Sequence, residues 1–174
     1  MDWMALIAIV FSLILIGFFA GIEIAFVSAS KLSVELKKKQ GTYAGRVWAA
    51  YMEKPARFIG TTLIALNILL AVYGLLWSDI LAGVWKFAGI NNDYVKLAAE
   101  TFLATFILLF FEFIFKAFFR AKGDIIIGSS IITFIVQFFY SLFAWVASVF
   151  VNLAEWILKY IFNVKIYARK EVFT

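Results

Sequence analysis

An almost unbroken apolar run near the amino terminus limits what this chain can fold into. Residues 4–27 are apolar apart from Ser12 and Glu23, and as a helix they would exceed the roughly 30 Å of hydrocarbon in a bilayer. The whole chain is 65% hydrophobic and 16% charged, whereas soluble domains average about 45–50% and 25%. We therefore predict an all-α integral membrane protein of one domain, because 174 residues leave room for about three or four crossings.

Two further apolar runs predict spans at residues 58–77 and 98–119. The segment between the first two spans carries a large excess of Lys and Arg over Asp and Glu, which is typical of a cytoplasmic loop. Short amphipathic helices at about 30–54 are expected to lie on the membrane surface, and three consecutive lysines would contact lipid headgroups there. These lysines are Lys37, Lys38 and Lys39.

The charge pattern also predicts the orientation of the chain. Lys116, Arg120 and Lys122 bring basic residues back at the far end of the third span, so that end should face the cytoplasm. Three transmembrane helices then place the N-terminus outside and the C-terminus in the cytoplasm, in the cell (inner) membrane.

Residues 125–163 allow two interpretations. Residues 131–151 carry no charge and are long enough to span, yet a fourth crossing would place the basic tail on the outer side. Polar or small residues recur every three or four positions along this segment and form one continuous helical stripe. We therefore predict juxtamembrane amphipathic belt helices along the inner interface, and keep four transmembrane helices as the alternative.

Each predicted span contains one polar group that is costly to bury in hydrocarbon. These groups are Glu23, Asn67 and Glu112. Small and polar residues share their helical faces, so we expect the three faces to meet and to bring two carboxylates and an amide together. The chain has no Cys and no His, so a bound ion must be held by oxygen, which suits Mg²⁺ or Na⁺.

Each of the three polar groups also has a simpler interpretation. Glu112 lies one turn from Lys116 and could form an ion pair within its helix. Asn67 could make a hydrogen bond between helices, and Glu23 could cap the interface or pair with a nearby basic residue. Two lone carboxylates without a defined pocket are weak support for acid/base catalysis, so we predict that the chain is not an enzyme. We expect the lipid bilayer as a partner and expect no binding to nucleic acid.

Three segments of the chain resemble the transmembrane domain of the CNNM/CorC family, the membrane part of magnesium transport proteins. Residues 17–31, GFFAGIEIAFVSASK, resemble the pattern F-F-S-x-x-E-x-A-x-x-S followed by a basic helix. Residues 55–67, PARFIGTTLIALN, are similar to N-P-x-R-F-x-x-T-x-L-I-G-N-N. Residues 111–116, FEFIFK, align with G-E-I-x-P-K. Together these segments extend the resemblance over almost the whole chain.

The resemblance implies a homodimeric, three-span domain with an ion site between the spans, in a family described as Na⁺-coupled Mg²⁺ exporters. The positions that match its ion-binding residues are Glu23, Ser28, Asn67 and Glu112, with Asn67 and Glu112 as metal ligands. It further implies that residues 1–163 form the transmembrane domain and that 164–174 begin a linker to cytoplasmic CBS domains. No CBS sequence is present, so we expect a truncated chain.

The chain departs from the family pattern at positions close to this site. The family's Ser is Ala20, its Gly-Asn is Ala65-Leu66, and its Gly and Pro are Phe111 and Phe115. Gly and Pro interrupt helical hydrogen bonding, whereas Phe at both places favours an unbroken third helix. The alternative to a transport domain is therefore a diverged, non-transporting membrane anchor or scaffold for a cytoplasmic regulatory domain.

Overall fold

The computed structural model describes residues 3–89 and 92–160, and this part of the chain is helical without strands. Its helices are α1 (Trp3–Ser28), α2 (Lys31–Lys39), α3 (Tyr43–Glu53), α4 (Pro55–Ala88), α5 (Asp93–Ala121), α6 (Gly123–Gly128) and α7 (Ser130–Tyr160). The predicted all-α membrane fold is confirmed. The predicted linker at 164–174 lies outside the described residues.

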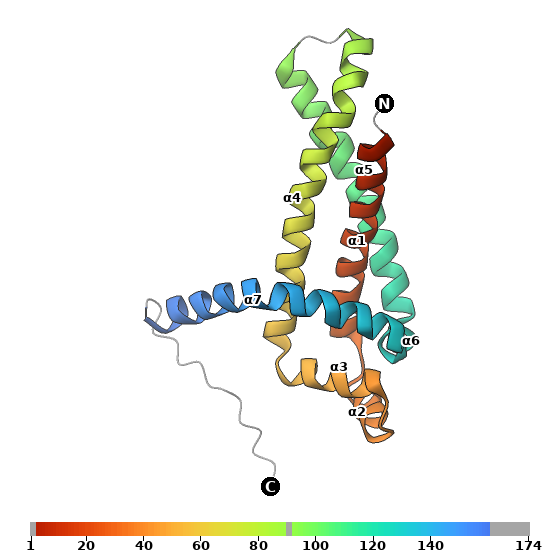
Figure 1. Ribbon diagram of the computed structural model, residues 1–174, viewed down its shortest axis with the longest axis vertical. Coiled ribbons are helices and arrows are strands. Elements are labelled where there is room, and N and C mark those ends of the chain that lie inside the picture. Colours follow the sequence, from red (N-terminus) through yellow and green to blue (C-terminus); the bar gives the residue numbers. More distant parts are fainter. Residues whose placement is uncertain (1–2, 90–91, 161–174) are drawn as a thin grey trace.

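Three long helices, α1, α4 and α5, run along the long axis of the molecule (Figure 1). The helix α1 packs against both α4 and α5, while α4 and α5 contact each other much less. Each contains one predicted span, but α4 and α5 extend beyond the predicted bounds toward their connection. The helix α4 continues through Gly83 and ends at Gly89, which adopts a left-handed conformation with φ of 65° that is common at helix ends.

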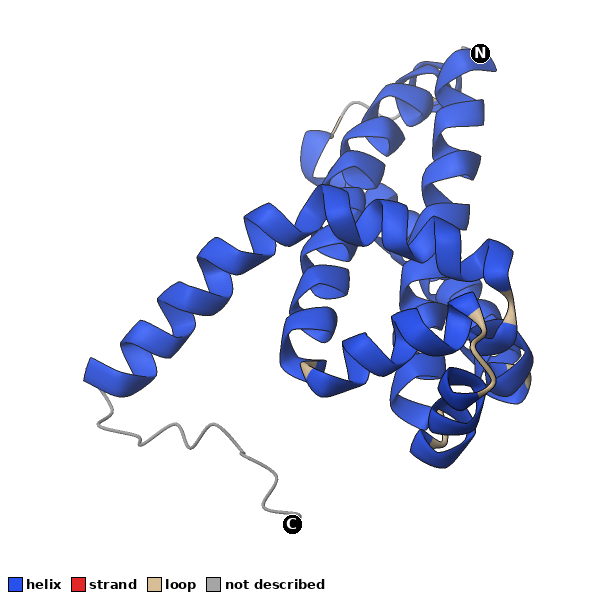
Figure 2. Cartoon of the chain, turned by 60° about the horizontal axis from the view of Figure 1, so that its bottom comes forward, coloured by secondary structure: helices blue, strands red, loops and turns tan. Residues whose placement is uncertain are grey.

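The helix α7 runs crosswise to these three helices and extends past them on one side (Figures 1 and 2). By length and composition, four helices could cross a membrane: α1, α4 up to Trp77, α5, and α7 up to Ala154. If α1, α4 and α5 cross a bilayer, α7 lies in the membrane plane at their basic end. This arrangement favours the predicted belt helices over a fourth span.

The helices α2, α3, α6 and α7 together form the juxtamembrane belt. The side chain of Ser30 caps the start of α2 and that of Thr42 caps the start of α3. Between them the chain turns at Gly41, whose φ of 74° is a conformation that glycine adopts readily. The Lys37 ammonium donates a hydrogen bond to the Asp124 carbonyl at 2.7 Å, which ties α2 to α6.

Polar contacts and an aromatic cluster join the belt to the spans. The indole of Trp48 in α3 is fully buried and donates to the Thr133 hydroxyl of α7 at 2.9 Å, while Tyr43 donates to Gln137. Part of the polar stripe predicted on α7 therefore faces α3. The cluster consists of Phe26, Trp48, Tyr51, Phe58 and Tyr140, with ring centroids 4.4–6.2 Å apart.

Candidate functional site

Two glycines of α1 let α5 approach closely and so set the position of the polar groups. A β-carbon on Gly17 would lie 2.6 Å from the ring of Phe115, and one on Gly21 would lie 2.6 Å from the ring of Phe119. Two small residues four positions apart are the usual spacing for close helix packing in membranes. We did not predict this contact, although the Gly-x-x-x-Gly spacing was visible in the sequence.

The same interface brings together the acidic residues of two predicted spans. The Lys116 ammonium lies 3.0 Å from the Glu112 carboxylate, one turn away on α5. The Glu112 side chain is 15% exposed, compared with 44% for Lys116. Glu23 of α1 is half-buried and close enough to interact electrostatically with both. Two carboxylates and one ammonium group thus lie in the same region of the α1–α5 interface, and the intrahelical pair expected for Glu112 is present.

Asn67 does not join this group. Its side chain is exposed, and its amide donates a hydrogen bond to the Leu63 carbonyl of its own helix at 2.9 Å. Ala71 and Gly74 lie on the same face and are also exposed. The expectation that this face of the second span meets the other two is therefore wrong for the described residues, because α4 packs on α1 through its other side.

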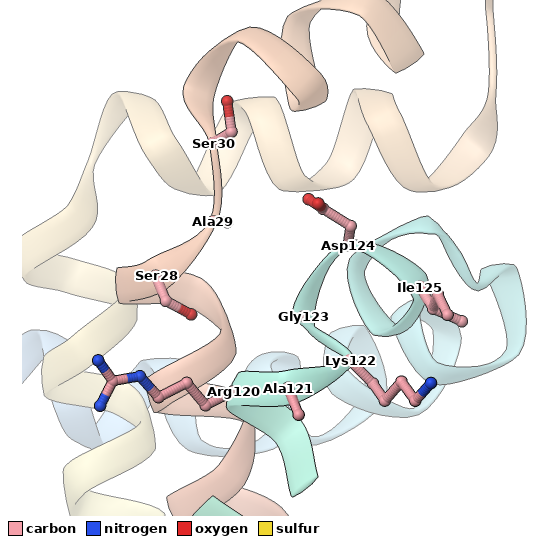
Figure 3. A pocket seen from close by; sticks show the side chains of 9 residues that line it. All are labelled: Ser28, Ala29, Ser30, Arg120, Ala121, Lys122, Gly123, Asp124 and Ile125. Carbon is pink, nitrogen blue, oxygen red and sulfur yellow. The ribbon is translucent and has the colours of Figure 1, made fainter. Parts of the chain in front are cut away.

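Ser28, the remaining predicted site residue, lies at the end of α1 beside a cavity of about 480 Å³. Its hydroxyl donates to the Ile24 carbonyl at 2.7 Å. Figure 3 shows the Asp124 carboxylate directed into the gap, whereas Arg120 and Lys122 extend away from each other. The cavity lies between the α1–α2 and α5–α6 junctions and is lined by Ser28, Ala29, Ser30, Arg120, Ala121, Lys122, Gly123, Asp124 and Ile125.

The residues that depart from the family pattern serve helix packing. The helix α5 is continuous from Asp93 to Ala121, as Phe111 and Phe115 led us to expect. Phe111 packs on the core formed with the N-terminal half of α1, Phe115 covers Gly17, and Ala20 is 1% exposed. Within the described ranges, no three His, Cys, Asp or Glu side chains are grouped so as to hold a metal ion. Ion binding at the predicted residues stays a prediction.

Comparison with known proteins gives one match. A family model described as the cyclin M transmembrane N-terminal domain, CNNM, matches residues 6–173. No curated protein and no solved structure matches the chain.

Proposed function

The chain belongs to the CNNM transmembrane family, which is associated with the transport of Mg²⁺ and other divalent cations, and on this basis we propose that it is a Mg²⁺ transport domain coupled to Na⁺. The observation that carries the proposal is the presence of Glu23 and Glu112, within electrostatic range of each other, on the two helices of the α1–α5 interface. Carboxylates inside a membrane are costly and mark ion pathways, and oxygen ligands suit both ions.

In this proposal the cation enters at the basic end of the bundle. It passes the cavity beside Ser28 and Asp124 and then reaches the two carboxylates, which lie further along α1 and α5. The Glu112 carboxylate forms an ion pair with the Lys116 ammonium in this structure. The lysine therefore acts as a tethered counter-charge, which keeps Glu112 paired while no cation is bound, and a divalent ion must displace it.

The other family features belong to the same proposal. Asn67 becomes a ligand beside Glu112 only if α4 turns about its axis, or if its exposed face meets a second copy of the chain. We propose a homodimer for this reason, with the belt and the C-terminus on the cytoplasmic side of the cell membrane. Cytoplasmic CBS domains would be the regulatory partner.

Calorimetric titration of the purified protein with Mg²⁺ tests the proposal. Lys116→Met should bind Mg²⁺ about tenfold more tightly, equal to about 1.4 kcal/mol, because the competing ammonium group is gone. Glu23→Gln and Glu112→Gln should weaken binding, and Na⁺ should compete with Mg²⁺. Lys54→Met is the matched control, since Lys54 is exposed, does not line the cavity beside Ser28 and has no ion pair with another described residue. Equal affinities in the two lysine variants would contradict this mechanism.

A second candidate is a non-transporting membrane anchor, and the packing of Phe111 and Phe115 favours it. These rings fill the α1–α5 interface where the family pattern has Gly and Pro, and α5 stays unbroken. Mg²⁺ flux into proteoliposomes separates the two candidates. Flux that is lost in Glu112→Gln supports transport, whereas a wild-type chain without flux or saturable Mg²⁺ binding supports the anchor.

A further inference from the structure

A second cavity lies between α4 and α5, in the half of the bundle remote from α7. Its volume is about 320 Å³. On α4 it begins at Leu70, well beyond Phe58, Thr61 and Thr62, where α4 borders α7. The residues that line it are Leu70, Tyr73, Gly74, Trp77, Leu97, Glu100, Thr101, Ala104, Thr105 and Leu108.

Glu100 places a carboxylate at the wall of this cavity. The side chain is half-buried, and one carboxylate oxygen accepts a hydrogen bond from the Trp85 indole at 2.5 Å. Lys96, one turn away, is instead 3.1 Å from Asp93. Among the described side chains, Glu100 has no cationic partner. A carboxylate held without a counter-ion at a mostly apolar wall favours the arrival of a cation.

The surroundings of Glu100 suit an organic cation better than a metal ion. Tyr73 and Trp77 form one wall, with ring centroids 6.0 Å apart in an edge-on arrangement. The Trp85 indole, outside this wall, donates a hydrogen bond to the Glu100 carboxylate. Aromatic rings beside a carboxylate are the usual recognition of ammonium and quaternary ammonium groups.

A hard divalent ion needs about six oxygen ligands, which this cavity does not offer. Besides Glu100, its wall provides three hydroxyl groups. The Thr101 hydroxyl donates to the Leu97 carbonyl at 2.8 Å, and the Tyr73 hydroxyl donates to the Ala104 carbonyl at 2.8 Å. Most of the remaining wall is apolar, which favours the methyl and methylene groups of an organic cation.

We propose that this cavity binds the ammonium group of an organic cation, with Glu100 as the counter-ion and Tyr73 and Trp77 as its aromatic wall. The ammonium can come from the ethanolamine or choline headgroup of a phospholipid in the leaflet remote from the belt, or from a free organic ammonium ion. The site does not depend on the proposed Mg²⁺ transport, because it shares no residue with the α1–α5 carboxylates.

Titration of the detergent-purified chain with tetramethylammonium, followed by tryptophan fluorescence, tests this site. The wild type should show a saturable change, and Glu100→Gln should bind at least tenfold more weakly. Glu35→Gln is the matched control, because Glu35 is an exposed carboxylate of α2, outside the cavity wall, and it should bind like the wild type.

A second variant fills the cavity without changing its charge. A β-carbon on Gly74 would meet no atom within 4 Å, so Gly74→Leu should fold and should lose tetramethylammonium binding. No saturable change in the wild type, equal losses in Glu100→Gln and Glu35→Gln, or displacement of tetramethylammonium by millimolar Mg²⁺ would each overturn the proposal.

Nanodiscs distinguish the two sources of the ammonium group. If the ligand is a lipid, nanodiscs of phosphatidylethanolamine should suppress tetramethylammonium binding to the wild type, whereas nanodiscs of phosphatidylglycerol should not. Equal tetramethylammonium binding in both lipids would support the site and assign it to a free organic ammonium ion.

Discussion

The contact between Gly17 and Phe115 can be tested by adding a single methyl group. Carbon atoms in contact lie about 3.5–4.0 Å apart, but a β-carbon on Gly17 would lie 2.6 Å from two carbons of the Phe115 ring. In Gly17→Ala the ring or the helix must therefore move by about 1 Å. Overpacking of this kind costs about 1–3 kcal/mol, and we expect Gly17→Ala to destabilise the fold by that amount.

A double-mutant cycle separates this clash from other effects of the substitution. In a Phe115→Ala background the clash partner is gone, so Gly17→Ala should be neutral, or stabilising by up to about 1 kcal/mol because Ala is the better helix former. Gly74→Ala is the matched control, because its β-carbon meets open space. The measurement is reversible unfolding by SDS in bicelles, followed by circular dichroism. An equal cost of Gly17→Ala in both backgrounds would refute the reasoning.

Three further predictions concern the belt and α5. Trp48→Phe removes the hydrogen bond to Thr133 and some buried ring volume, so it should lower the free energy of unfolding by about 1–3 kcal/mol in the same SDS titration; an unchanged midpoint would contradict this. Burial, with a contribution from neighbouring tyrosines, raises the pKa of the Tyr51 phenol above its ordinary value, so the unfolded chain loses this proton first as the pH rises. Stability should therefore fall above about pH 10. Melting temperatures measured from pH 8 to 11 should fall less in Tyr51→Phe than in the wild type. They should fall as much as in the wild type in Tyr94→Phe, whose ring is 86% exposed. Phe115→Pro should cost about 3 kcal/mol more than Phe115→Ala because it breaks a helical hydrogen bond; equal stability of the two variants would show that α5 tolerates a kink there.

The direction of α7 and the continuity of α5 could be predicted from the sequence because each depends on a local property. The basic residues around 131–151 disfavoured a fourth crossing, and the structure turns α7 across the bundle. Phe111 and Phe115 predicted a helix without a break, since neither frees a backbone carbonyl. The Glu112–Lys116 pair followed from the one-turn spacing.

The choice of neighbouring helix could not be predicted in the same way. Small residues show where a backbone can be approached, but they do not say which helix approaches it. Asn67, Ala71 and Gly74 therefore suggested a face turned toward the other spans, yet this face is exposed. Instead, the rings of Phe115 and Phe119 in α5 pack against Gly17 and Gly21. The difference depends on shape complementarity between distant segments, which hydropathy and charge do not encode.

The belt makes the two ends of the molecule unequal in cross-section. At the basic end, α7 alone, with 31 residues, occupies about 46 Å of the membrane plane at 1.5 Å per residue, in addition to α2, α3 and α6. At the other end the described residues form only the long helices (Figure 1). The protein therefore displaces more lipid area in one leaflet than in the other. A bilayer that contains many copies relieves this difference in area by becoming convex on the belt side. Local membrane curvature is therefore coupled to the position of the belt helices.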